Sequence, residues 1–396
     1  MKNKINFYDG FIQDDVIWFS SLNHNALMTL NIKSGKIELI GPFPGCKSYQ
    51  KNLHICVIEN NGCLYFIPRN GNFVHVFNIK KMSFEDAIRL PYLDNTYIAN
   101  ALLDENGKIW IVPTYFRDGI VTLNTDKRTT EKVGNLEFLN CPEDTSIGFN
   151  CVCYNHGIIS ICMLKSNRII YIDTESNVVT DEYLDGDFKP YAFLSGDGET
   201  YYFSNYSDHT IMSWNKKEQM SYQVSSKMNC EFEGYIYWNY IIKGQTILCL
   251  PCDTDDLFLI DVLEKKERHI SLKDMVKKNS CNATFSFYKE YKGKAYVFPS
   301  GADSLLIIDS NDWSIKSLDY IISDRLQQQI QEACDENLRQ AICSGIVSES
   351  IEYDETLGNF LDYIVQNEKI EIISDRSGTD VGSQIHWKVR QRVFEG

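Results

Sequence analysis

The chain has 396 residues, a formal net charge of −15, and aromatic and hydrophobic fractions of 13% and 43%. An acidic surface repels nucleic-acid phosphates and anionic lipid, so we expect no nucleic-acid or membrane-surface partner. No apolar segment follows the N-terminal lysines, and no run of about 18 apolar residues occurs. We therefore expect no membrane insertion and a cytoplasmic protein whose 13 cysteines are reduced thiols.

A short strand that ends in Asn or Asp recurs seven times along the chain. The end residues lie 42 to 49 positions apart and are Asn31, Asn78, Asn124, Asp173, Asn215, Asp261 and Asp309. Six positions before each stands a second polar residue, which is Asn or Asp in six copies and His209 in the fifth. Because Asn and Asp favour turns, we expect both positions to bound one strand and to serve a structural role in every copy.

Another strand precedes each of these. In four copies it ends in a proline, which stops a strand because it has no N–H to donate: Pro68, Pro113, Pro251 and Pro299. Six copies follow a turn with glycine in second place, such as Asn61-Gly62, where glycine supplies the positive φ of a tight hairpin. Each repeat therefore contains hairpin-connected strands.

The complete unit has four strands in about 46 residues, the size of a propeller blade. It resembles kelch-type repeats in strand order and length, although the double glycine of those repeats is absent and proline often stands there. The sequence thus predicts an all-β fold, a seven-bladed β-propeller of four-stranded blades over residues 1–321. The resemblance implies fold rather than function. How the ring closes stays open: either residues 1–5 add an edge strand or the tail covers the seam.

Residues 322–396 are predicted to form a helical C-terminal tail. Apolar residues spaced by four indicate a first helix, with Ser323 as its cap: Leu326, Ile330, Cys334, Leu338, Ile342 and Ile346. A second helix is expected over about 355–366 and a third from about 380. The tail either packs on the propeller or docks a partner protein.

The loops between the second and third strands of a blade (b–c loops) and those between blades (d–a loops) are expected on one face, where propellers commonly bind ligands. Polar and aromatic side chains suited to a ligand occur there. Our candidate binding residues are His54, Arg69, Tyr115, Arg117, Asn205, His209 and Asp255. The same loops carry His24, Lys47, Tyr49, Tyr97, Asp144, Lys189 and Asp253.

We expect no metal site and no cofactor. Cys249-Leu-Pro-Cys252 has the spacing of half a zinc site, but no second pair exists, and it falls at a strand end rather than at a helix start. These cysteines are therefore read as structural thiols. No serine-hydrolase, phosphate-loop or zinc-protease motif occurs, which leaves open whether the protein is an enzyme.

The leading functional hypothesis is a non-catalytic binding or scaffold module that recognises a protein partner or a glycan-type ligand on the loop face. The pattern is also similar to that of bacterial kelch-like propeller proteins associated with polysaccharide biosynthesis, which favours glycan-pathway partners. The alternative is a carbohydrate-active hydrolase or lyase at the mouth of the central channel. Its first candidate acid–base groups are His54, His209 and Asp255.

Overall fold

The computed structural model describes residues 5–47, 50–92, 96–133, 146–164, 166–226, 236–277 and 284–343. The chain forms two compact units, residues 1–336 and 337–396. The second unit lies almost wholly outside the described residues, as do the helices predicted over 355–366 and from 380. The fold described below is therefore that of the first unit, with one helix that continues past it.

In its described residues, the first unit contains 28 strands in seven sheets. Blades 1 and 2 contain β1 (Gly10–Gln13), β2 (Val16–Ser20), β3 (Leu27–Asn31), β4 (Ile37–Gly41), β5 (His54–Asn60), β6 (Cys63–Pro68), β7 (Phe73–Asn78) and β8 (Ser83–Arg89). Blades 3 and 4 contain β9 (Ile98–Leu103), β10 (Lys108–Pro113), a 3-10 turn η1 (Phe116–Asp118), β11 (Val121–Asn124), β12 (Thr129–Lys132), β13 (Ile147–Asn155), β14 (Ile158–Met163), β15 (Arg168–Asp173) and β16 (Val179–Tyr183).

Blades 5 to 7 follow in the same order. They contain β17 (Pro190–Ser195), β18 (Thr200–Asn205), β19 (Ile211–Asn215), β20 (Met220–Gln223), β21 (Tyr237–Lys243), β22 (Thr246–Pro251), β23 (Asp256–Asp261), β24 (Lys266–Ser271), β25 (Phe285–Tyr291), β26 (Lys294–Pro299), β27 (Leu305–Asp309) and β28 (Ile315–Leu318). Helix α1 spans Asp324–Cys343.

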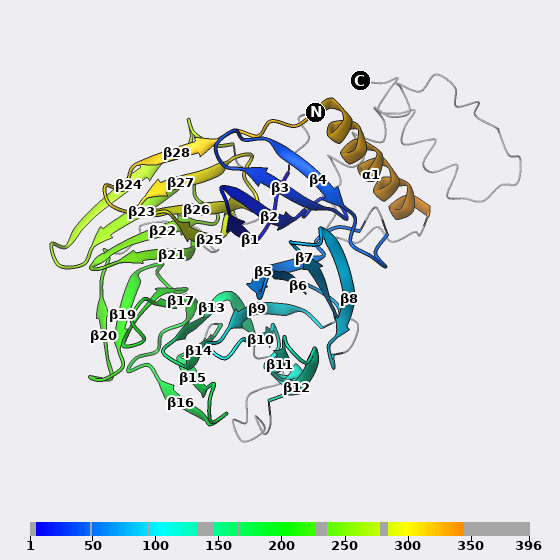
Figure 1. Ribbon diagram of the computed structural model, residues 1–396. Coiled ribbons are helices and arrows are strands. Elements are labelled where there is room, and N and C mark those ends of the chain that lie inside the picture. Colours follow the sequence, from blue (N-terminus) through cyan, green and yellow to red (C-terminus); the bar gives the residue numbers. More distant parts are fainter. Residues whose placement is uncertain are drawn as a thin grey trace, which may run out of the picture. The chain divides into compact units, whose positions relative to one another are not determined.

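Each sheet is an antiparallel meander of four consecutive strands, and the seven sheets follow one another round a ring (Figure 1). The first strands of neighbouring blades contact one another, from β1·β5 round to β1·β25, so these strands line the ring axis. The predicted seven-bladed, all-β propeller is confirmed. Blade 1 has all four strands, and within the described ranges no blade combines strands from the two ends of the chain.

All seven third strands end at the Asn or Asp that marks the repeat. In every copy its side-chain oxygen accepts a main-chain N–H two or three residues further on, at 2.8–3.0 Å. This contact closes the turn into the fourth strand. The Asn or Asp recurs along the sequence because the same turn, between the third and fourth strands, occurs in every blade.

The hairpin before each second strand also follows from local chemistry. Asn61 and Gly62 have φ of 53° and 76°, and His156-Gly157 and Lys292-Gly293 repeat this pair of positive values. Two consecutive positive φ angles define the type I′ turn, whose twist matches that of the flanking strands. The four second strands that contain a final proline end at that proline, as the sequence predicts.

The ring closes where the N-terminal segment meets blade 7. The main-chain N–H of Phe7 donates to Pro299 O at 3.0 Å, and Asn6 Nδ2 donates to Ala302 O at 2.7 Å. The fully buried Phe7 ring stacks on Phe19 of blade 1 and lies 5.3 Å from the Phe298 ring of blade 7. The seam is therefore held by hydrogen bonds and by an aromatic contact that spans both blades.

The chain beyond blade 7 attaches to the outer strand of blade 1. Ile321 forms a parallel bridge with Lys36, in which its N–H donates to Gly35 O at 2.8 Å and its carbonyl accepts the Ile37 N–H at 3.0 Å. These closing contacts come from residues 6–7 and 321, which lie next to the two segments that the sequence put forward for closure, residues 1–5 and the tail from residue 322. Residues 1–4 lie outside the described part of the chain.

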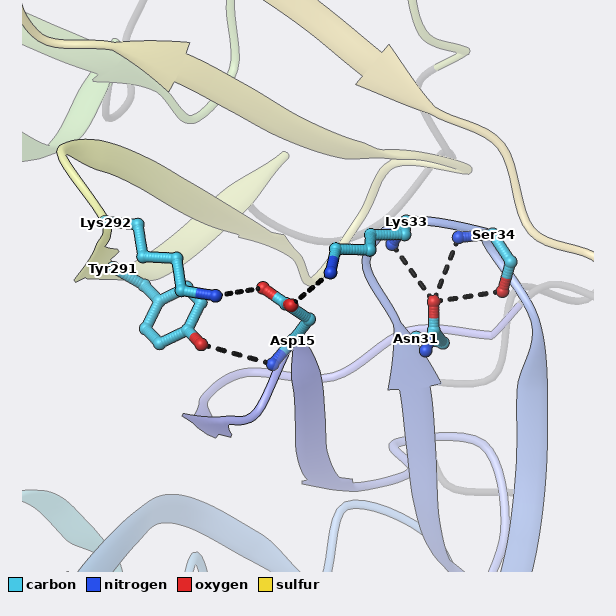
Figure 2. A network of polar contacts seen from close by, with 6 residues as sticks. All are labelled: Asp15, Asn31, Lys33, Ser34, Tyr291 and Lys292. Carbon is cyan, nitrogen blue, oxygen red and sulfur yellow. Dashed lines mark hydrogen bonds and ion pairs between the residues drawn. The ribbon is translucent and has the colours of Figure 1, made fainter.

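Figure 2 shows a polar network at the same seam, on the face opposite the b–c loops. Asp15 lies in the first turn of blade 1, where its carboxylate pairs with Lys33 at 2.6 Å and with Lys292 of blade 7 at 2.8 Å. Its main-chain N–H donates to the Tyr291 hydroxyl at 3.2 Å. Hydrogen bonds from the two lysines lower the pKa of Asp15 to about 2. The carboxylate therefore stays ionised and keeps both ammonium groups at the seam.

Helix α1 begins as predicted, because Ser323 Oγ accepts the main-chain N–H of Leu326 at 3.3 Å. Leu326 and Ile330 are buried in the same apolar cluster as Phe7 and Phe298. The apolar residues in the first turns of α1 therefore pack at the seam between blades 1 and 7. Among the described residues, no helix combines the length and the apolarity needed to cross a membrane.

We predict that Phe7→Ala weakens the ring seam. Truncation of a fully buried phenylalanine removes apolar burial and leaves a cavity, and we expect a loss of about 3–5 kcal/mol in the free energy of unfolding, measured by urea denaturation. The control is Leu263→Ala, whose side chain is 74% exposed and which should change stability by no more than about 0.5 kcal/mol. An equal, small effect of both variants would contradict the seam as a stabilising contact.

Candidate functional site

Main-chain hydrogen bonds join the b–c and d–a loops on one face of the ring. Arg69 N donates to Leu53 O at 2.9 Å, and Tyr206 N donates to Lys189 O at 2.8 Å. Neighbouring blades are also linked here, because Ile98 N donates to Arg69 O at 2.9 Å. All seven candidate residues lie on or beside this face, which we call the loop face. Tyr49 and Asp144 lie outside the described residues.

His54 is buried and belongs to a hydrogen-bonded chain inside blades 1 and 2. Its Nδ1 lies 2.8 Å from Ser20 Oγ, and its Nε2 lies 2.8 Å from His75 Nδ1. His75 Nε2 lies 3.1 Å from the Pro44 carbonyl oxygen, which can only accept. In neutral rings this fixes every donor: His75 donates to Pro44, His54 donates to His75, and Ser20 donates to His54. Both ring nitrogens of His54 are thus engaged by protein groups.

Both rings of this chain are held neutral. Burial, together with the neighbouring His75, lowers the pKa of His54 well below its ordinary value. Burial also lowers the pKa of His75, against a smaller opposing effect of its bond to Pro44. His24, buried nearby with Nδ1 3.2 Å from Ser21 Oγ, has its pKa lowered to about 4 by burial.

Asn205 and His209 are buried as well and shape the b–c loop of blade 5. Asn205 Oδ1 accepts the Lys189 N–H at 3.1 Å, and its Nδ2 donates to Asp208 Oδ1 at 2.9 Å. His209 has φ of 56°, donates its main-chain N–H to Asn205 O, and places its ring 6.3 Å from that of Tyr191. The loop turns through the left-handed region at His209, a conformation that histidine adopts more readily than most residues other than glycine.

The polar residue that precedes the third strand ties loops together in several blades. Asn25 Nδ2 donates to Phe43 O and Cys46 O, and Asn25 Oδ1 accepts the Phe43 N–H at 2.8 Å. Asn167 Nδ2 donates to Gly186 O, and Asp303 accepts the Lys277 N–H at 2.8 Å. Each contact joins a b–c loop to a d–a loop, in keeping with the structural role expected from the repeat.

Arg69, Tyr115 and Arg117 form an aromatic and cationic surface together with Tyr97. Tyr97 and Tyr115 are 47% and 36% exposed, and the Arg117 guanidinium lies 5.1 Å from the centre of the Tyr115 ring. Arg69 stacks over Tyr8 at 4.9 Å and donates to the Tyr8 hydroxyl. We call Arg69, Asn70, Tyr97, Tyr115 and Arg117 the Tyr–Arg strip.

Main-chain contacts fix the order of the strip around blades 2 to 4. Asn70 bridges Tyr97, the Thr114 N–H donates to Tyr97 O at 2.7 Å, and Tyr115 bridges Ser146. The two exposed tyrosines therefore lie on adjacent segments of a rigid, hydrogen-bonded backbone. Asp255 is separate from the strip, because it lies in blade 6 beside a small cavity.

The ring axis is crossed by amide side chains that the sequence interpretation did not select. Asn150 of β13 donates to Ser286 O of β25 at 3.3 Å, and Asn239 of β21 donates to Asn150 Oδ1 and to Ser286 O at 3.3 and 3.1 Å. Four residues of β13, 148–151, stand between its pairs with Met163 and Ile161, and this bulge carries Asn150 to the axis.

These contacts join blades 4, 6 and 7, and we call Asn150, Asn239 and Ser286 the axial bridge. The sequence contains a pattern that could have pointed to these residues, because Asn100, Asn150 and Asn239 all stand near the start of the first strand of a blade. The bulge that directs Asn150 inward has no comparable sequence signature. The axial bridge lies at the ring axis, whereas the alternative enzyme hypothesis placed its substrate at the mouth of the central channel.

The residues put forward for acid–base or metal chemistry are dispersed over the ring. His54, His209 and Asp255 lie in blades 2, 5 and 6, and both histidines are buried. No group of three or more metal-ligating side chains occurs among the described residues. Cys249 and Cys252 are buried and form no disulfide, and burial raises the pKa of the Cys249 thiol. The structure therefore does not assemble the residues that sequence reasoning put forward for catalysis.

Comparison with known proteins shows the fold. No protein-family model and no curated protein matches the sequence. Among solved structures, a streptogramin B lyase is similar at 15% identity, with 76% of this chain and 91% of that chain covered and a TM-score of 0.57. A catalytically inactive variant of virginiamycin B lyase from Staphylococcus aureus with quinupristin is similar at 13% identity, with 76% and 95% covered and a TM-score of 0.58.

A dihydro-heme d1 dehydrogenase is also similar, at 12% identity, with 78% of this chain and 64% of that chain covered and a TM-score of 0.50. Proteins with different activities thus share this architecture, and at such identities the likeness extends to the fold alone. The chain is a seven-bladed β-propeller. Its specific likeness to kelch repeats finds no support in these comparisons and stays a prediction.

We predict that stability falls as the pH drops below about 6.5. His24, His54 and His75 have folded-state pKa values below the unfolded value of roughly 6.5, so the unfolded chain binds more protons in that interval. Each histidine then contributes a slope of up to about 1.4 kcal/mol per pH unit until its own lowered pKa is reached. Urea denaturation at a series of pH values between about 7.5 and 5, on either side of the ordinary histidine pKa, measures this slope.

His54→Phe should be less stable than the natural chain at neutral pH, but it should show a shallower dependence on pH, because one titrating group is gone. The control is His156→Asn, an exposed turn position with φ of 48° that asparagine tolerates, which should keep the natural slope. If the slope were unchanged in His54→Phe, the buried chain would not be its source.

Proposed function

We propose that the protein is a non-catalytic binding module that recognises an acidic, glycan-type ligand through the Tyr–Arg strip. The observation that carries the proposal is the pair of exposed tyrosine rings on adjacent, hydrogen-bonded segments with an arginine stacked beside them. The strip also lies on the face where propellers commonly bind their ligands. Recognition there needs no acid–base pair.

The chemistry of the strip supports a saccharide that carries carboxylate groups. A tyrosine ring offers a rigid apolar face to the C–H side of a pyranose and a hydroxyl at its edge. The guanidinium of Arg117 is exposed and presents forked donors that match a carboxylate. On a chain of net charge −15, an anionic ligand needs such a local concentration of cationic groups.

Backbone rigidity supports binding without a large ordering cost. Tyr97 follows Thr96 into β9 and is bonded on both sides, through Asn70 and Thr114. Preorganised contacts lose less conformational entropy when a ligand binds. The same rigid backbone would suit a scaffold that binds a protein partner. We also propose that the protein acts in a polysaccharide pathway in the cytoplasm.

The test is an oligosaccharide array that carries neutral and uronate-containing chains, followed by calorimetry with the uronate oligosaccharide of highest affinity. Tyr97→Ala and Tyr115→Ala should each weaken binding by about tenfold or more, equivalent to about 1.4 kcal/mol. Arg117→Lys should also weaken binding, because lysine keeps the charge but loses the forked donors.

Tyr222→Ala is the matched control, since that side chain is 46% exposed but lies on β20, away from the strip. It should bind as the natural chain does. Failure of every uronate-containing chain to bind, or equal binding by Tyr97→Ala, Tyr115→Ala and Tyr222→Ala, would refute the proposal.

A further inference from the structure

A cavity of about 270 Å³ lies on the loop face between blades 6 and 7, away from the Tyr–Arg strip. Its lining comes from the b–c loop of blade 6, the d–a segment that follows, and the start of blade 7: Asp255, Leu272, Lys273, Val276, Lys277 and Thr284. The lining therefore combines one carboxylate, two ammonium groups, one hydroxyl and two aliphatic side chains.

The wall of this cavity is rigid. Leu272 and Thr284 are buried, the Leu272 N–H donates to Asp255 O at 2.9 Å, and the Val276 N–H donates to Leu272 O at 3.0 Å. Asp303 holds the far end of the segment through the Lys277 N–H, at 2.8 Å. These bonds fix the backbone positions from which the charged side chains extend.

The polar groups divide into an acceptor set and a donor set. Thr284 Oγ1 donates its proton to Cys252 O at 2.7 Å, so toward the cavity it can only accept. Asp255 is a second acceptor, whereas Lys273 and Lys277 are donors only. Among the residues that the structure describes, none forms an ion pair or hydrogen bond with the charged group of Asp255, Lys273 or Lys277.

From this division we propose that the cavity binds a free α-amino acid with an aliphatic side chain. Asp255 and Thr284 accept from the ligand ammonium, Lys273 and Lys277 donate to its carboxylate, and Leu272 and Val276 contact its side chain. The cavity volume of about 270 Å³ is close to the lower end of the range of about 300–1,000 Å³ that is usual for small-molecule sites, which suits a ligand as small as leucine. This site goes beyond the proposed glycan recognition and is independent of it.

Calorimetry on the full chain with three probes measures how much the ammonium group and the carboxylate group of the ligand each contribute to affinity. L-Leucine carries both charges, 4-methylpentanoate lacks the ammonium, and 3-methylbutylamine lacks the carboxylate. We expect saturable binding of L-leucine, with each analogue about tenfold weaker or more, because each loses charge-assisted hydrogen bonds.

Substitutions in the cavity lining show which residues bind the ammonium group and which bind the carboxylate. Asp255→Asn should weaken L-leucine about tenfold and leave 4-methylpentanoate unchanged, whereas the double variant Lys273→Gln, Lys277→Gln should weaken L-leucine and leave 3-methylbutylamine unchanged. Asp274→Asn is the matched control, because this exposed carboxylate lies in the same turn but does not line the cavity.

The substituted side chains are exposed, so the variants should fold, and far-ultraviolet circular dichroism confirms this. The absence of saturable L-leucine binding, equal affinity for the analogues, or equal binding by Asp255→Asn and Asp274→Asn would overturn the proposal. Because Tyr97 and Tyr115 do not line the cavity, a failure here leaves the array experiment on the strip unaffected.

Discussion

A propeller whose blades all come from consecutive strands depends on the joint between its first and last blade. Among the strands that the structure describes, none crosses this joint. It is held by side-by-side contacts: the Phe7 N–H on Pro299 O, the aromatic stack of Phe7 on Phe19, and Ile321 on the edge of β4. Hydrophobic burial supplies most of the stabilisation, and the main-chain hydrogen bonds fix the register. The Asp15 network adds ionic contacts on the opposite face.

Closure of the ring determines which surfaces remain for function. The first strands surround the axis, and the axial bridge of Asn150, Asn239 and Ser286 connects three of them. Similarly, both ring nitrogens of His54, which sequence reasoning assigned to a ligand, have partners in the hydrogen-bonded chain from Ser20 to Pro44. What remains is the outer part of the loop face, where Tyr97, Tyr115 and Arg117 are exposed and where Asp255 lines a cavity.

The sequence was sufficient for features that arise within a few residues. The Asn or Asp at the end of each third strand closes a turn through its own side chain, and glycine before six of the second strands supplies a positive φ, so the blade and its sevenfold repetition could be predicted. The start of α1 at Ser323 was predictable for the same reason.

Features that depend on distant contacts could not be predicted. His54 and Asn205 have the composition of ligand-binding residues, but their partners, His75 and Lys189, are set by how strands and loops pack. The bulge in β13 directs Asn150 across the ring to blade 7, a pairing over 136 positions that no local pattern marks. Tyr97 and Tyr115 become neighbours only through the pairing of β9 with β10.

Hydrogen–deuterium exchange with and without the uronate oligosaccharide selected on the array tests most directly whether recognition lies on the outer loop face. We expect slower exchange of main-chain amides at residues 96–98 and 114–118, which contain the two exposed tyrosines and Arg117, and no change in β13 or β21. Slower exchange confined to β13 and β21, at the axial bridge, with the strip unchanged, would contradict that placement and would locate the ligand at the ring axis.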